Sequence, residues 1–455
     1  MLARLWVLMA TVFADMVGFL IVLPLLPFYA ERFGAEPAMI GYLVGAFALA
    51  QLVTAPLWGL FSDRFGRRPM ILLGLGTSAV AFALFGFVEP IAAAIVAIDP
   101  PADPAAAKEL AAAWGVAILF VSRVVQGAGG GTTGVVQAYV SDSVEPKQRA
   151  KALGWVTAAT SAGVMIGPVL GSQASRLGHA APGLVAAGLC LLNLAFAWRL
   201  LPEPERRDER GGERPAPTSL RRSLAEVRRR PAQALGALGR IYASVGRSVA
   251  EVARRPTGAV SSLIWIYAAG MMAFMAMNAM LALYLNRAFG VTEEDIGWYY
   301  AYVGGVSLLM RGLLLGPILT RLGEVRTLRL GVVSLAAGLA LLPVPTHVAS
   351  LAVVVVLVPV GTALLFPATT SLVAGRSEER QVGQTLGVQQ TFGGISRLLG
   401  PFWSGLLFQH VGIASPFWVA SGLVLAVGLF SWTVREEAPA GDVEAAEAAV
   451  PVDPA

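Results

Sequence analysis

The sequence predicts an all-α membrane protein in which twelve transmembrane helices form two pseudo-symmetric six-helix bundles. Three observations lead to this prediction. Hydrophobic residues make up 56% of the 455 residues and charged residues only 14%, whereas a soluble domain carries about a quarter charged residues. Apolar stretches long enough to cross the hydrocarbon of a bilayer recur along the chain. The two halves of the chain also repeat short segments in the same order.

The apolar stretches fall into two groups of six. The expected spans of the first half are 5–30, 38–61, 69–88, 113–141, 150–174 and 181–201. Those of the second half are 259–285, 296–320, 326–344, 348–374, 384–409 and 414–434. The first run is too long for a cleavable signal peptide, and further spans follow it. We therefore expect bundles over 1–201 and 258–435, a cytoplasmic linker with amphipathic helices over 202–257, and an acidic disordered tail over 436–455.

The repeat is visible in the connections. "YAERFGAEPAMIG" (29–41) parallels "YLNRAFGVTEEDIG" (284–297), and "GLFSDRFG" (59–66) parallels "GPILTRLG" (316–323). Internal repeats joined by a long connection are typical of transporters that rock about a central site.

The positive charge indicates the orientation. Lys and Arg concentrate in the connections 62–68, 146–151, 202–257, 321–329 and 375–380, whereas the alternate connections are short or acidic. Because positively charged loops remain on the cytoplasmic side, we expect both termini to be cytoplasmic. The protein is then a multi-pass protein of a bacterial-type cytoplasmic membrane.

The segment 202–257 holds 13 Arg against 7 Asp and Glu, and it contains a small duplication. "SLRRSLAEVRRRP" (219–231) and "SVGRSVAEVARRP" (244–256) agree at nine of thirteen positions. This segment predicts two amphipathic helices on the membrane surface, bound to anionic lipid. A solvated basic linker is the alternative. The charge does not indicate a nucleic-acid partner, because it is confined to this loop. The apolar positions at helical spacing are Leu220, Leu224, Val227, Leu238, Ile241, Val245, Val249 and Val252.

The loop after the second span, "GLFSDRFGRRPMI" (59–71), combines glycines with charges. Gly59 and Gly66 permit a close helix contact and a tight turn. Arg67 has two expected partners, Asp63 and Asp142. We expect these pairs to act as a cytoplasmic latch that stabilises the outward-facing state and breaks on inward opening. The alternative is that Arg64, Arg67 and Arg68 only enforce topology.

The fifth span contains "GVMIGPVLG" (163–171), in which Gly163, Gly167 and Gly171 share one helix face. Small residues at this spacing allow two helices to approach closely, and Pro168 bends the helix. Ordinary packing of glycines is the alternative.

Four ionisable residues lie deep in expected spans: Asp15, Arg123, Arg311 and Arg397. An ion at the centre of a bilayer costs at least about 2.5–3.5 kcal/mol, so such residues are candidates for function. Asp15 is ten residues from Leu5, which places it about 15 Å along the helix. Burial disfavours a charged carboxylate and a neighbouring arginine favours it. Movement of Asp15 between a position without a partner and a position paired with an arginine would therefore switch its proton affinity. A permanent ion pair that fixes helix packing is the alternative.

Further polar residues of the expected cavity are Gln126, Asn278 and Gln389. They would supply hydrogen bonds to a substrate, and the methionines of the seventh span would provide an adaptable apolar wall. Arg311 and Arg397 have an alternative role in packing or gating. The single cysteine, Cys190, excludes an internal disulfide, and no cluster of metal ligands is apparent.

Three motifs resemble those of the major facilitator superfamily. "GLFSDRFGRRPMI" is similar to its loop signature, "RVVQGAGG" (123–130) to its fourth-span arginine motif, and "GVMIGPVLGS" (163–172) to its fifth-span antiporter motif. The whole chain resembles the drug/proton antiporters of the tetracycline-resistance type. This resemblance implies that spans one, four, seven and ten line a central cavity in which Asp15 faces Arg123. The chain lacks the acids that this subgroup carries in spans three and nine, so Asp15 must carry most of any proton coupling and tetracycline is an unfavourable substrate.

These observations predict a secondary transporter that exports a small amphipathic or drug-like molecule in exchange for protons by alternating access. A facilitator or exchanger of an anionic or zwitterionic metabolite is the alternative, because the deep arginines exceed the deep acids. A scaffold or sensor that transports nothing is a third hypothesis. No nucleotide-binding loop and no catalytic constellation occurs in the sequence, so we expect neither an enzyme nor a cofactor. The expected partners are the substrate, protons and membrane lipids, and we expect a monomer.

Overall fold

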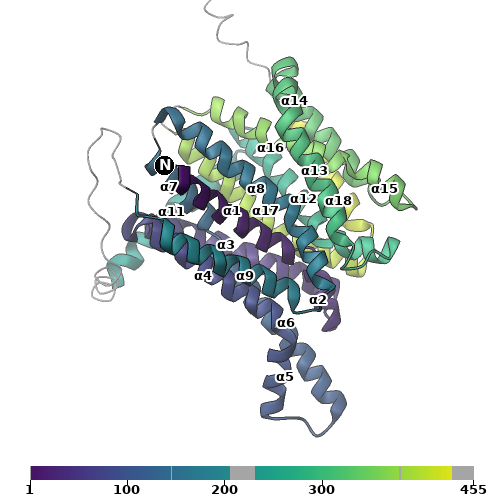
Figure 1. The fold of residues 1–455 in the computed structure, drawn as a ribbon. Helices are drawn as coiled ribbons and strands as arrows, with labels where there is room; N and C mark the ends of the chain where they lie inside the picture. Colours follow the sequence, from purple (N-terminus) through teal and green to yellow (C-terminus); the bar gives the residue numbers. More distant parts are fainter. Residues whose placement is uncertain (1, 145, 205–230, 379–380, 433–455) are drawn as a thin grey trace, which may run out of the picture.

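The computed structural model describes residues 2–144, 146–204, 231–378 and 381–432, which form helices and connecting turns without a strand (Figure 1). The first half comprises α1 (Leu2–Val22), α2 (Leu26–Arg32), α3 (Pro37–Phe65), α4 (Arg67–Gly86), α5 (Val88–Ile98), α6 (Pro104–Gly129), α7 (Thr132–Ser143), α8 (Pro146–Ser175) and α9 (Ala181–Leu200). The linker contributes α11 (Pro231–Arg254). The second half comprises α12 (Ala259–Phe289), α13 (Ile296–Leu309), a π-helical segment η1 (Met310–Leu314), α14 (Leu315–Leu341), α15 (Val348–Val355), α16 (Leu357–Gly375), α17 (Val382–His410), α18 (Ser415–Gly428) and a 3₁₀ turn η2 (Leu429–Trp432).

The described residues contain the twelve predicted spans. Ten helical stretches are long and apolar enough to cross a membrane. One of these, Ile296–Leu341, is two spans, because Gly323 has a φ of 76° and breaks the helix between them. The twelfth span is α17, which has 29 residues and packs between α3 and α12.

The two halves pack in the same way. In the first bundle α1 contacts α8, and α4 lies between α6 and α9. In the second bundle the equivalent first span α12 contacts α17, and α14 lies between α16 and α18. The predicted pair of pseudo-symmetric six-helix bundles is therefore confirmed, and in Figure 1 the purple-to-teal helices of one bundle face the green-to-yellow helices of the other.

The two ends of the molecule differ. We call the end at which α3, α9 and α11 finish the linker end, and the other the opposite end. Near the opposite end the bundles meet closely through α3 against α17 and α8 against α13. A Cβ atom added to Gly41 would lie 2.3 Å from the carbonyl oxygen of Pro401, and one added to Gly297 would lie 2.3 Å from that of Pro168. Only glycine allows the backbones to approach this closely.

Charged residues join the two bundles at the opposite end. Arg32 pairs with Glu293, and Arg287 Nη2 lies 3.0 Å from Glu31 Oε1. Arg176 Nε lies 3.5 Å from Glu294 Oε2. These pairs and the glycine contacts hold this end of the interface closed.

The linker helix α11 contacts both bundles. The hydroxyl of Tyr242 donates to the carbonyl of Val53 on α3, and Gln384 Nε2 on α17 donates to Ser248 Oγ at 3.3 Å. Val249 and Val252 pack against the main apolar core. We expected this helix to lie on the membrane surface, but part of its apolar face is covered by protein. The helix predicted at 219–231, with Leu220, Leu224 and Val227, lies outside the described residues, as do the side chains of Leu238, Ile241 and Val245 and the tail 436–455.

We predict that Gly297→Ala weakens the closure of the opposite end. The new methyl group would meet the backbone of Pro168, and such overpacking costs about 1–3 kcal/mol. Spin labels at Leu177 and Trp298, in a Cys190→Ala background, should report a longer mean distance in this variant. Gly188→Ala is the matched control, because its methyl group would meet nothing within 4 Å. Distances that are equal in both variants would contradict the role of the glycine contact.

Candidate functional site

The first bundle contains a layer of buried polar side chains between two apolar clusters. The layer consists of Asp15 on α1, Ser78 on α4, Arg123 and Gln126 on α6, and Asn193 on α9. On α1, α4 and α9 the polar residue lies between members of the two clusters. One cluster contributes Val12, Leu75 and Ala197, and the other contributes Val17, Ala79 and Cys190. We call these five residues the polar layer. Three helices, α1, α4 and α9, thus change from one apolar cluster to the other through a polar residue.

Asp15 is half-buried in the middle of α1. Ser78 Oγ donates a hydrogen bond to its Oδ1 at 3.4 Å. The carboxylate is therefore directed toward α4, within the first bundle, where α9 also packs against α1 and α4.

Arg123 is 1% exposed, which is unusual for a guanidinium group. Its Nη2 lies 3.4 Å from Ser122 Oγ, and its guanidinium carbon lies 5.7 Å from the centre of the Phe85 ring. The Nε atom has no hydrogen-bond partner among the described residues.

Asp15 and Arg123 form no ion pair in the part of the chain that the structure describes. The α4 residues that they contact, Ser78 and Phe85, are seven positions apart, or about 10 Å along the helix. The expectation that the two groups face one another is therefore not met in this conformation. The two groups share the interior of one bundle, and each contacts a different turn of α4.

Two amides complete the polar layer. Gln126 is 4% exposed and its Oε1 has no partner, and Asn193 is 5% exposed with neither Oδ1 nor Nδ2 bonded to the described residues. A buried polar atom without a partner costs about 1–3 kcal/mol. The layer therefore contains hydrogen-bonding groups that the described residues do not satisfy. Sequence reasoning missed Ser78 and Asn193, although an asparagine in "CLLNLAF" (190–196) was a visible signal.

The predicted cavity residues of the second bundle lie apart from this layer. Asn278 Nδ2 donates to the carbonyl of Phe274 at 2.8 Å, and buried Gln389 donates to Thr370 Oγ1 at 3.0 Å. Arg311 is exposed within η1, and Arg397 is half-buried on α17. None of their described bonds reaches Asp15 or Arg123.

The glycines of the fifth span lie against α1, as predicted for close packing. Added Cβ atoms on Gly163 and Gly167 would lie 2.9 Å from the carbonyl oxygens of Phe13 and Val17, which bracket Asp15. Gly171 approaches Ile21 in the same way, at 2.7 Å. Because the neighbouring Pro168 contacts Gly297 of α13, α8 connects the helix of Asp15 to the interface between the bundles.

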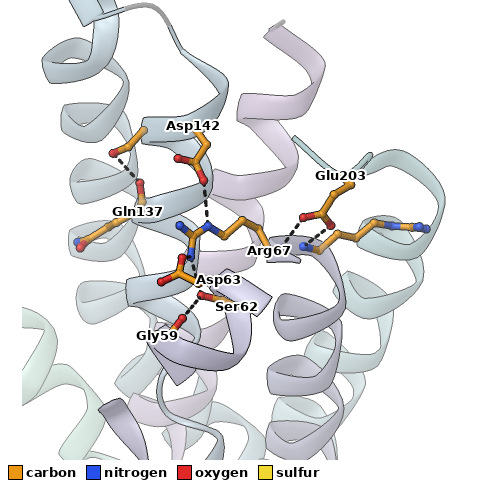
Figure 2. A network of polar contacts seen from close by, with 9 residues as sticks. Gly59, Ser62, Asp63, Arg67, Gln137, Asp142 and Glu203 are labelled. Atoms are coloured by element: carbon orange, nitrogen blue, oxygen red, sulfur yellow. Dashed lines mark hydrogen bonds and ion pairs between the residues drawn. The ribbon is translucent and has the colours of Figure 1, made fainter. Parts of the chain in front are cut away.

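A second polar site surrounds Arg67 at the linker end (Figure 2). Arg67 Nη1 lies 2.8 Å from Asp63 Oδ1, and its Nε lies 2.9 Å from Asp142 Oδ2. Nη1 also donates to Ser62 Oγ at 2.6 Å. Both ion pairs expected of Arg67 are present. They join α3, α4 and α7 within one bundle, so their effect on the alternation between states remains a prediction.

Sequence reasoning missed Glu203, which caps α4. Its carboxylate oxygens accept from the backbone N–H groups of Arg67 and Arg68 at 2.6 and 3.0 Å. A carboxylate at this position satisfies free N–H groups and complements the helix dipole. Gly66, with a φ of 108°, makes the turn, and a Cβ atom there would lie 2.7 Å from Glu203 Oε1. Gly59 has no neighbour within 4 Å of its Cβ position, so the close helix contact expected there is absent among the described residues. Arg68 Nη2 donates to the carbonyl of Trp198, and Arg64 lies in the last turn of α3.

The sequence matches the family model of the Major Facilitator Superfamily over residues 8–252 and 263–454. It is 26% identical over 424 residues to multidrug resistance protein 2 of Bacillus subtilis, covering 93% of this chain and 92% of the relative. It is 24% identical to the class G tetracycline resistance protein of Vibrio anguillarum, covering 89% and 90%. The fold is similar to that of the human organic anion transporter MFSD10, with a TM-score of 0.62, 20% identity and coverage of 94% and 99%.

We predict that Asp142→Asn and Asp63→Asn destabilise the first bundle and slow transport. Arg67 is 8% exposed, and hydrogen bonds to charged groups contribute about 1.5–3 kcal/mol each. Thermal unfolding in detergent should show a lower midpoint for both variants, with Asp142→Asn the more affected because Asp63 is the more exposed partner. Glu109→Gln, an exposed site on α6, is the control. Normal transport by Asp63→Asn would remove the latch hypothesis even if the stability changes.

Proposed function

The chain belongs to the Major Facilitator Superfamily, and from this premise we propose that it exports a small amphipathic, drug-like molecule in exchange for protons by alternating access. The protein is a multi-pass membrane transporter rather than an enzyme. The observation that carries the proposal is Asp15, the deep acid of the spans, which lies in a polar layer with unsatisfied partners.

Two lines support a drug-like substrate. The relatives that match over nearly the whole chain are named for resistance to several drugs, to quinolones and to tetracycline. The helix α12 also carries five methionines, of which Met277 and Met280 are buried, and flexible thioether side chains adapt to varied apolar shapes.

We place the linker end in the cytoplasm, because most Lys and Arg of the connections lie there. The closed opposite end then faces outward, so the described conformation is inward-facing. With this orientation the pairs of Arg67 with Asp63 and Asp142 are intact in the inward-facing state, which conflicts with the expectation that they break on inward opening. In the outward-facing state the contacts of Gly41 and Gly297 separate, and α3 and α17 approach one another at the linker end. The position of α11 between Val53 and Gln384 must change in that transition.

The proton step follows from the two environments of Asp15. In the outward-facing state the carboxylate takes up a proton, which neutralises it and lowers the cost of its burial. In the inward-facing state the proton leaves to the cytoplasm, and the charged carboxylate is stabilised by the hydroxyl of Ser78, its partner in the described conformation, and by the positive charge of Arg123 in the same bundle. A substrate that requires the same groups displaces the proton. Because α8 packs on α1 around Asp15 and on α13 across the interface, the movement of the bundles is coupled to this site.

The alternative function is a facilitator or exchanger of an anionic or zwitterionic metabolite. One observation favours it: Arg123 is buried without an acidic partner among the described residues. A buried cation of this kind would bind a carboxylate or phosphate of a substrate. This alternative requires no proton flux linked to substrate movement.

We predict that Asp15→Asn abolishes uptake driven by a pH gradient. Purified protein in proteoliposomes would be tested with a lipophilic cationic dye, a quinolone and tetracycline, with an imposed gradient. Wild type should accumulate the dye or the quinolone. In Asp15→Asn the rate of gradient-driven uptake should fall at least about tenfold, since no second deep carboxylate replaces Asp15. Exchange without a gradient should continue.

Glu89→Gln is the matched control, because Glu89 is an exposed acid outside the polar layer. Wild-type flux that carries no protons would favour the facilitator. Gradient-driven flux that persists in Asp15→Asn would show that another group carries the proton.

A further inference from the structure

Asn193 is a buried amide whose hydrogen-bonding capacity is unused. It lies on α9 and is 5% exposed, and neither its Oδ1 nor its Nδ2 has a partner among the described residues. Buried polar side chains in proteins are nearly always hydrogen-bonded. An amide with both functions free therefore indicates that its partner is present in another state of the protein.

Asp15 lies on α1, which packs against the helix of this amide. Cys190, one turn before Asn193, is within electrostatic range of Asp15. On α1 Asp15 lies between Val12 and Val17, and on α9 Asn193 lies between Ala197 and Cys190, members of the same two apolar clusters. Because α1 packs along α9, these positions place the carboxyl group and the amide at adjacent levels of one interface.

The chemistry of an amide distinguishes the two forms of a carboxyl group. A protonated carboxyl donates its O–H to the amide oxygen and accepts an N–H at its carbonyl oxygen, so both amide functions are satisfied. A carboxylate has no proton to donate and leaves Oδ1 without a partner. An arginine has the opposite preference, because it only donates and carries a positive charge.

Resting on the proton coupling proposed above, we propose that Asn193 is a positioning residue that binds the protonated form of Asp15. A proton from the outer side adds to the Asp15 carboxylate, and the neutral acid turns from Ser78 to the Asn193 amide. When the proton leaves to cytoplasmic water, the carboxylate returns to Ser78, its partner in the described conformation. Asn193 thus favours the protonated form, whereas the Ser78 hydroxyl and the positive charge of Arg123 in the same bundle favour the carboxylate.

The other groups around Asp15 do not replace this role. α4 presents the hydroxyl of Ser78, α8 presents the backbone near Gly163, and neither titrates. On α9 the titratable group is the Cys190 thiol, whereas the Arg123 guanidinium on α6 contacts Phe85, on a different turn of α4. A thiol is only a weak donor and a weak acceptor, and a guanidinium only donates, so neither matches an amide.

The test is a pH titration of the Asp15 carboxyl by infrared difference spectroscopy, without substrate. The acid carbonyl band that Asp15→Asn removes identifies the group. In Asn193→Leu the midpoint should fall by about one pH unit, a tenfold loss of proton affinity, because two hydrogen bonds to the neutral acid are removed. Asn193→Gln, which keeps the amide, should lie between wild type and Asn193→Leu.

Cys190→Ala is the matched control, since it alters the same helix next to Asp15 without removing an amide, and it should leave the midpoint unchanged. A midpoint that is equal in wild type and Asn193→Leu, or that shifts equally in Cys190→Ala, would overturn the inference. The readout does not depend on transport. If the midpoint shifts in Asn193→Leu but the flux of the wild type carries no protons, the role of Asn193 is supported and the proposed antiport is rejected.

Discussion

The cost of placing polar groups inside a membrane bundle is the constraint on which this structure depends. The first bundle interrupts two apolar clusters with a carboxyl group, a guanidinium group, two amides and a hydroxyl. Each group loses water, and several have no partner among the described residues. Apolar side chains at these positions would stabilise the bundle. We proposed that the layer is retained because its groups change partners when a proton moves.

The glycine face of α8 connects this layer to the interface between the bundles. Gly163 and Gly167 bring α8 against the turns of α1 on either side of Asp15. A few residues further along, Pro168 and Ser172 contact Gly297 of the other bundle, and Ser172 Oγ accepts from the Gly297 N–H at 2.8 Å. One helix thus touches both the helix of Asp15 and the closed end of the interface. In the proposed mechanism, rocking of the bundles and exchange of partners by Asp15 are parts of one movement.

Features set by local pattern were predictable from the sequence. Span length and apolar composition located the twelve helices, and the spacing of Gly163, Gly167 and Gly171 indicated their shared packing face. The partners of Arg67 followed from charges at neighbouring helix ends. These features depend on residues within one helix or one loop, so periodicity and spacing reveal them.

Features set by the arrangement of several helices were not predictable. The separation of Asp15 from Arg123 depends on how α1 and α6 are rotated against α4, which no spacing in the chain records. Ser78, Asn193 and Glu203 join their sites only because α4 and α9 pack together. The packing of α11 on both bundles depends on an apolar surface that forms only in the folded protein. The common cause is that tertiary packing selects the partner of a polar side chain.

The most direct test of this account counts the protons that substrate displaces. Purified wild-type protein in weakly buffered detergent solution would be mixed with a transported dye or quinolone, and the released protons would be measured with a pH indicator. The account predicts about one proton for each substrate molecule bound by wild type and none for Asp15→Asn. Equal release by both proteins would contradict it, because Asp15 would then not be the group that exchanges a proton for substrate.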